Sequence, residues 1–109
     1  MSLLDVAPII EQMLLTSDNV SDLNFSCGQK PQVEINGKLH SVTPLGMGRL
    51  TAYQTEMIAM SILRDNADAA MQLARTRTAD LSYALPGKCR FRVNIFQQRN
   101  SYSIVMRVI

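Results

Sequence analysis

Hydrophobic and polar residues alternate with two different periods along the chain. Near the N-terminus the apolar positions recur every three or four residues, at Val6, Ile9, Ile10, Met13 and Leu14. Asp5 can cap a helix that carries this stripe and runs to about Thr16. Pro8 is tolerated because the first-turn N–H groups have no helical partner. A helix with one apolar stripe predicts a sheet for it to cover.

Strict alternation of apolar and polar residues begins at residues 21–27, SDLNFSC, and predicts a strand with one buried face. The run QVEI at 32–35 predicts a second strand, and residues 38–43 predict a third. Asn36-Gly37 between them is a typical two-residue hairpin turn. We therefore expect three short antiparallel strands after the first helix.

Two more helices are predicted in the middle of the chain. Thr51 and Gln54 have the spacing of a capping box, and the helix that they open reaches about Arg64. Asn66 can cap an Ala-rich helix that continues through Arg75.

Three further alternating runs, 79–85, 88–96 and 101–108, predict the last strands, separated by Pro86-Gly87 and by a polar loop at 97–100. A chain of 109 residues holds one modest core. The fold class predicted for residues 1–109 is a single α+β domain. It has a mostly antiparallel sheet of about six strands and about three helices.

The last two strands place arginines on one face of a hairpin. If residues 97–100 form the loop, Phe96 pairs with Ser101 and Arg90 faces Arg107. Arg90, Arg92 and Arg107 then share one side of the sheet, because a one-residue slip would bury them. Asp80 is the one acidic residue placed to neutralise any of them.

Charge is distributed unevenly along the sequence. Residues 1–74 hold four basic against eight acidic side chains, a net −4, whereas residues 75–109 hold seven basic against one acidic, a net +6. Like charges opposed across strands repel. Two interpretations stay open: a solvated basic face, or a site for an anion such as phosphate, which guanidinium forks bind well.

Other sites and locations have weaker signals. Cys27 and Cys89 lack metal or disulfide-framework spacing and are expected to be small buried thiols. His40, the only histidine, lacks partners for catalysis and is expected at the surface. No apolar run is long enough for a membrane helix and no signal peptide precedes the domain, so we expect a cytoplasmic protein without membrane insertion.

The segment ADLSYALPGKCRFRVNIFQQRNSYSIVMRVI (79–109) resembles the signature of the N-terminal domain of type IV pilus retraction ATPases, the PilT/PilU twitching motility family. SDLNFSCGQKPQVEINGKL (21–39) is similar to the opening segment of that domain, with Asn24 where the family has histidine. The resemblance spans nearly the whole chain. It implies a PAS-like domain hinged to a RecA-like motor domain in a homo-hexamer of the type II/IV secretion ATPase superfamily.

The resemblance also implies a site and partners. Arg92 and Arg107 match the arginines that reach nucleotide held by the motor domain, and Arg90 matches a third family position. The implied partners are the motor domains of the same and neighbouring subunits and the inner-membrane platform protein of the pilus, at which the parent would be peripheral. The motor domain would bind most of the ATP and Mg²⁺.

The sequence contains no G-x-x-x-x-G-K-[ST] phosphate loop, so we expect residues 1–109 to be a fragment that is not an enzyme alone, with an ATPase as its parent. Two rival functions remain. One is a stand-alone PAS-like module for ligand sensing or protein interaction. The other is nucleic-acid binding, which is disfavoured because Phe91 and Tyr102 lie on the face opposite the arginines.

Overall fold

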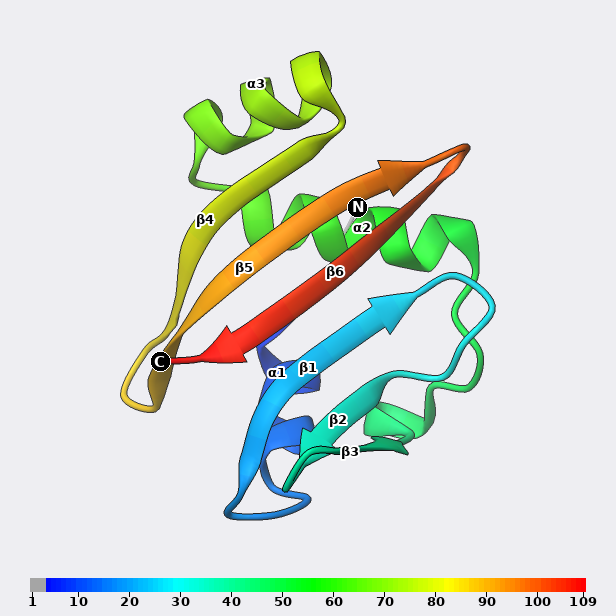
Figure 1. Cartoon of the computed structure of the whole chain (residues 1–109), viewed down its shortest axis with the longest axis vertical. Coiled ribbons are helices and arrows are strands. Elements are labelled where there is room, and N and C mark those ends of the chain that lie inside the picture. Colours follow the sequence, from blue (N-terminus) through cyan, green and yellow to red (C-terminus); the bar gives the residue numbers. More distant parts are fainter. Residues whose placement is uncertain (1–3) are drawn as a thin grey trace.

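The computed structural model describes residues 4–109 as three helices and one six-stranded antiparallel sheet (Figure 1). The strand order is β3-β2-β1-β6-β5-β4, so the first and last strands of the chain are neighbours in the middle of the sheet. The elements are α1 (Ala7–Leu14), β1 (Val20–Ser26), β2 (Gln32–Ile35), β3 (Lys38–Ser41), η1 (Pro44–Gly46), α2 (Ala52–Leu63), α3 (Ala67–Thr76), β4 (Thr78–Leu85), β5 (Cys89–Gln98) and β6 (Ser101–Val108). The predicted α+β fold class is confirmed.

The helices leave one face of the sheet uncovered. Figure 1 shows α1 and α2 behind the sheet, and α3 beside β4. The core lies between the helices and the covered face, where alternate strand residues such as Leu23, Phe25, Phe91 and Ile104 are fully buried. The opposite face carries no helix within residues 4–109. None of the helices in that range is long and apolar enough to cross a membrane.

The predicted caps of α2 and α3 are present, whereas the N-cap of α1 is Val6 and Asp5 only contacts its first turn. Thr51 and Gln54 form the capping box reciprocally, with distances of 3.1 and 2.9 Å between side chain and backbone. Asn66 Oδ1 accepts the Ala69 N–H at 2.9 Å. Asp5 Oδ1 accepts the N–H that begins α1, at 3.1 Å. Each contact satisfies a backbone donor that the helix itself leaves unpaired.

The register of the last hairpin differs from the prediction by two residues. Gln98 pairs with Ser101, so Arg92 rather than Arg90 faces Arg107. The turn is only two residues long because Arg99 adopts a left-handed conformation with φ of 54°, which closes the hairpin without a longer loop. A shift of two keeps every side chain on its predicted face. The expected division into a packing face and a basic face is therefore confirmed.

Strand β1 contains an irregularity that sets the direction of its side chains. Val20 pairs with Ile35 and Asp22 pairs with Glu34, so Ser21 is an extra residue, as in a β-bulge. Val20 packs against the core, as does Leu23 three residues later. The extra residue lets both of these apolar side chains face the helices while Asp22 faces the uncovered side.

The expected burial of both cysteines is wrong for Cys27. Strand β1 ends at Ser26, so Cys27 lies in the following turn and is exposed. Cys89, at the start of β5, is half-buried against the core, and burial raises the pKa of its thiol. Alternation in the sequence indicates a face only while the strand continues.

We expect Cys27 to react with an aromatic disulfide reagent at pH 8 about tenfold faster than Cys89, because thiolate content and access control the rate. The single-cysteine variants Cys89→Ala and Cys27→Ser separate the two rates. Equal rates would contradict the different environments of the two thiols.

Candidate functional site

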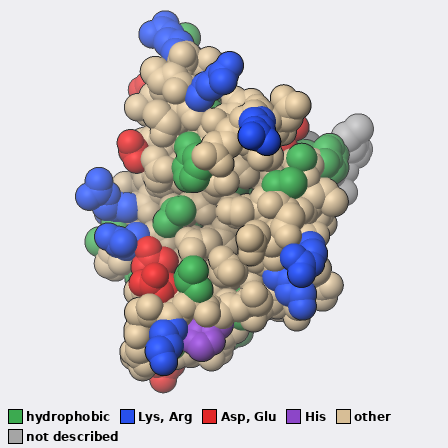
Figure 2. Space-filling model, turned by 45° about the vertical axis from the view of Figure 1, so that its right-hand side comes forward, with side chains coloured by type: hydrophobic (Ala, Val, Ile, Leu, Met, Phe, Trp, Pro, Cys, Tyr) green, Lys and Arg blue, Asp and Glu red, His purple; other side chains and the backbone are tan. Residues whose placement is uncertain are grey.

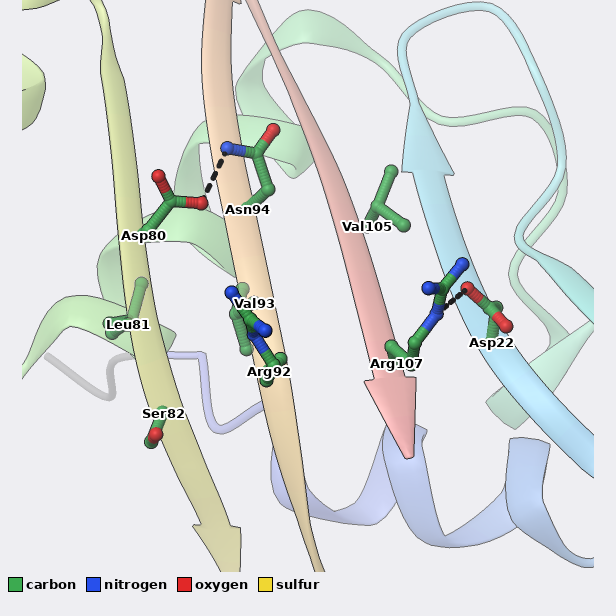
Figure 3. Close-up of a pocket in the computed structure, with 9 residues that line it drawn as sticks. All are labelled: Asp22, Asp80, Leu81, Ser82, Arg92, Val93, Asn94, Val105 and Arg107. Carbon is green, nitrogen blue, oxygen red and sulfur yellow. Dashed lines mark hydrogen bonds and ion pairs between the residues drawn. The ribbon is translucent and has the colours of Figure 1, made fainter. Parts of the chain in front are cut away.

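The uncovered face of the sheet has a shallow depression of about 530 Å³ over β4, β5, β6 and β1 (Figure 3). Its polar lining comes from Asp22, Asp80, Ser82, Arg92, Asn94 and Arg107. The depression is open to solvent along the strands. Such a site suits a group presented by a second surface better than an enclosed small molecule.

Arg92 and Arg107 are the two cations of this depression, and they lie directly opposite each other on β5 and β6. Both side chains are exposed, with 72% of the Arg107 side chain accessible. Arg92 has no ion-pair partner within residues 4–109. Two guanidinium groups at neighbouring positions repel each other unless an anion lies between them.

Arg90, the third predicted site residue, is exposed on the same side of β5 but does not line the depression. Its carbonyl accepts the N–H of Ile109 at 2.9 Å, at the end of the hairpin. The structure therefore brings together Arg92 and Arg107 and leaves Arg90 to one side.

Asp22 is the residue that sequence reasoning missed. It lies on β1 directly opposite Arg107, and its Oδ2 accepts from the Nε of Arg107 at 3.3 Å. The side chain of Asp22 is only 8% exposed. Alternation placed Asp22 on the polar side of its strand, but the pairing of β1 with β6 is a long-range contact that no local pattern indicates.

Asp80 does not neutralise an arginine, contrary to the expectation. Its Oδ1 accepts from the side-chain amide of Asn94 at 3.0 Å, and that amide also lies 3.5 Å from the carbonyl oxygen of Ala79. The β4–β5 register causes this pairing, because Asp80 faces Asn94 whereas Ser82 faces Arg92.

A buried polar atom on the same face has no partner. Asn24 Oδ1 is inaccessible to solvent and accepts no hydrogen bond from residues 4–109. Asn24 follows Asp22 by two residues on β1 and pairs with Val105 of β6. An unsatisfied buried acceptor is costly.

Two of the three aromatic side chains in the last hairpin lie away from the arginines, and only the half-buried Phe96 shares their face. Phe91 is fully buried and Tyr102 is half-buried against the core, both on the face opposite the arginines, as predicted. Figure 2 shows lysine and arginine side chains in several separate groups on the face in view, not in one continuous stripe. The rival prediction of an RNA-binding hairpin therefore gains no support from geometry.

Within residues 4–109, no three His, Cys, Asp or Glu side chains gather as a metal site.

The two arginines are expected to affect stability differently. Arg107→Ala should lower the free energy of unfolding by about 1 to 2 kcal/mol, because the buried carboxylate of Asp22 loses its partner. Arg92→Ala should change it by less than about 0.5 kcal/mol, since it removes an opposed like charge. Urea denaturation measures both values, and equal losses would contradict the difference in partners.

Comparison with known proteins gives consistent relatives, although no family model matches the sequence. The chain is 29% identical over 89 residues to the type IV pilus retraction ATPase PilT of Pseudomonas aeruginosa, a match that covers 82% of this chain and 24% of that protein. The crystal structure of the pilus retraction motor PilT with bound ADP has a TM-score of 0.79 at 28% identity, covering 95% of this chain and 29% of the other.

The ATPase DotB of Legionella pneumophila shares the fold, with a TM-score of 0.72 at 23% identity, covering 100% of this chain and 30% of the other. The chain thus spans between 24% and 30% of the length of these relatives. Its sheet order, helices and sequence resemble the N-terminal domain of a pilus retraction ATPase. In sequence and fold together, the chain is similar to PilT, at 28% to 29% identity.

Proposed function

We propose that this domain is the regulatory, nucleotide-clamping domain of a hexameric ATPase that powers type IV pilus retraction. In this proposal, Arg92 and Arg107 contact the phosphates of ATP that a motor domain holds. The observation that carries the proposal is the placement of these two arginines opposite each other on the uncovered face of the sheet. Arg90 is assigned a supporting contact at the end of the same hairpin.

The chemistry of phosphoryl transfer explains why arginines would be used. Negative charge spreads over the oxygens of the transferred phosphoryl group, and guanidinium groups stabilise that charge with paired N–H donors. An arginine delivered by a separate domain adds this stabilisation only when the two domains close. Mutual repulsion between Arg92 and Arg107 in the open state would be relieved by the phosphate.

The remaining partners follow from the same proposal. Residues 1–109 would be the N-terminal domain of a longer chain whose motor domain supplies most contacts to ATP and Mg²⁺. The similar structure of the motor PilT contains bound ADP, which supports nucleotide as the ligand. The uncovered sheet face would dock on motor domains of the same and neighbouring subunits. The hexamer would act in the cytoplasm, at the platform protein of the pilus machine.

Single replacements in the full-length parent test this function. We expect Arg92→Ala and Arg107→Ala each to lower ATP turnover by about 10²-fold, the usual cost of losing one donor to a charged transition state. Arg99→Asn is the matched control, because it removes a charge from the same hairpin outside the depression and asparagine tolerates positive φ. Normal turnover in both site variants would refute the assignment.

A further inference from the structure

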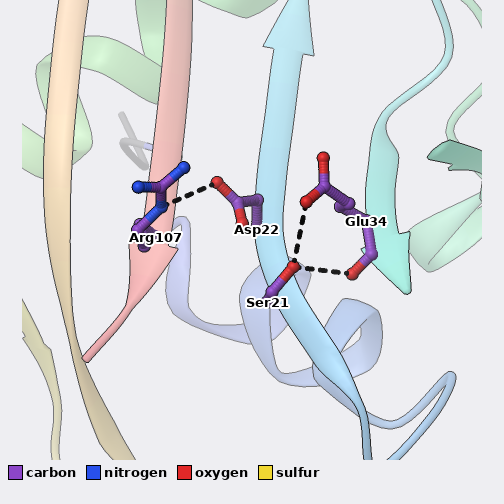
Figure 4. Close-up of polar contacts among 4 residues, drawn as sticks. All are labelled: Ser21, Asp22, Glu34 and Arg107. Atoms are coloured by element: carbon purple, nitrogen blue, oxygen red, sulfur yellow. Dashed lines mark hydrogen bonds and ion pairs between the residues drawn. The ribbon is translucent and has the colours of Figure 1, made fainter. Parts of the chain in front are cut away.

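We propose that Asp22 is a positioning residue that holds the guanidinium group of Arg107 in the orientation needed for an anion. This inference rests on the proposed function for the identity of the anion. It adds a residue of β1 to a site otherwise built from the last hairpin. Figure 4 shows the two contacts that carry the argument, between Arg107 and Asp22 and between Ser21 and Glu34.

The carboxylate of Asp22 takes only one donor from Arg107. Its Oδ2 lies 3.3 Å from Nε, and no other hydrogen bond from the Arg107 guanidinium is formed within residues 4–109. An Nε contact leaves both terminal amino groups available. These groups supply the paired donors that a phosphate or carboxylate accepts. Asp22 therefore fixes one edge of the guanidinium group and leaves the recognition edge open.

The two partners differ in accessibility, and this difference favours positioning over a purely structural ion pair. The Asp22 side chain is 8% exposed, whereas the Arg107 side chain is 72% exposed. A largely buried carboxylate on a central strand has little freedom of movement. A long arginine side chain in water has many rotamers and loses them on binding. Anchoring Arg107 to a fixed carboxylate lowers that entropic cost before the anion arrives.

The irregularity in β1 lies immediately before Asp22. Ser21 is the extra residue relative to β2, and its hydroxyl lies 3.3 Å from both the backbone oxygen and Oε2 of Glu34. Glu34 also pairs with Asp22 across the strands. Bulges often redirect side chains beside functional sites. The contact between Ser21 and Glu34 holds the backbone of β1 next to Asp22.

The first experiment measures the orientation of Arg107 without reference to nucleotide. In the 109-residue chain, ¹⁵N NMR follows exchange of the Arg107 Nε–H with water. We expect Asp22→Asn, which is nearly isosteric, to speed this exchange by roughly an order of magnitude. Asp80→Asn is the matched control, since Asp80 binds Asn94 and should leave Arg107 unchanged. Unchanged exchange in Asp22→Asn would overturn the proposal.

The second experiment measures ATP turnover in the full-length parent. Asp22→Asn is expected to lower kcat by about fivefold to tenfold with less than about a twofold change in KM, as for a contact that strengthens in the transition state. In an Arg107→Ala background, the same change should have no further effect. Asp18→Asn, in the exposed turn before β1, is the activity control.

The outcomes separate the two proposals. Full activity of Asp22→Asn beside an impaired Arg107→Ala would overturn the positioning role and leave the nucleotide contact intact. Normal turnover of Arg107→Ala and Arg92→Ala would overturn the nucleotide contact, while NMR would still decide whether Asp22 orients Arg107. Arg107→Lys independently checks whether the guanidinium group itself is needed. Lysine keeps the charge but lacks the paired N–H donors, so this variant is expected to lose activity even if Asp22→Asn folds poorly.

Discussion

Removing Arg92 and Arg107 together is expected to lower ATP turnover of the full-length protein by about 10³-fold. The loss should be smaller than the product of the two single losses. Both side chains lie over one depression and would contact the same phosphate, so each is less useful once the other is absent. The opposed positions on β5 and β6 are the reason for this coupling.

Steady-state kcat and KM for the wild type, the two single variants and the double variant form the cycle that measures this coupling. Melting temperatures of the same four proteins control for loss of folded protein. A double variant whose loss equals the product of the single losses would contradict a shared phosphate. A double variant with normal turnover would remove the arginines from catalysis altogether.

Phe91→Ala is expected to lower the free energy of unfolding by about 3 to 5 kcal/mol, because it leaves a large cavity in the core. Phe91 is fully buried, near the start of β5 on its packing face, with the Tyr83 ring 6.4 Å away between centroids. The total free energy of unfolding of a small domain is only about 5 to 15 kcal/mol. The melting temperature should fall by on the order of 15 °C.

Phe96→Ala provides the matched control for this prediction. Phe96 lies on the same strand but on the uncovered side, and it is half-buried. The identical substitution should therefore cost less than about 1.5 kcal/mol, since less apolar surface is lost and no enclosed cavity forms. Urea denaturation of the two variants gives the comparison. Similar losses would contradict the assignment of the two faces.

The elements of this fold were predictable because their signals are local. Thr51 with Gln54 and Asn66 each mark a helix start that depends only on backbone donors a few residues away. Alternation in β5 and β6 separated packing and basic faces for the same reason. The hairpin register was off by two because polar residues 97–100 were all assigned to the loop, whereas strand ends at the rim of a sheet are also polar.

The candidate site was predictable only in part. Arg92 and Arg107 share a face for reasons internal to one hairpin, so the sequence was enough to group them. Asp22 contacts Arg107 across 85 positions of sequence. This contact needs the pairing of β1 with β6, which depends on the whole fold. The extra residue at Ser21 also depends on two strands together. Long-range pairing of this kind carries no short-range signal.

The adjacency of β1 and β6 has a consequence for how the domain is made. Within this domain, β1 leaves the ribosome before the other strands, whereas its neighbour β6 leaves after them. Until β6 has been synthesised, β1 therefore lacks one of its two neighbouring strands at the centre of the sheet. The carboxylate of Asp22 and the guanidinium of Arg107 meet only when β6 docks on β1, so an incompletely folded chain lacks this contact.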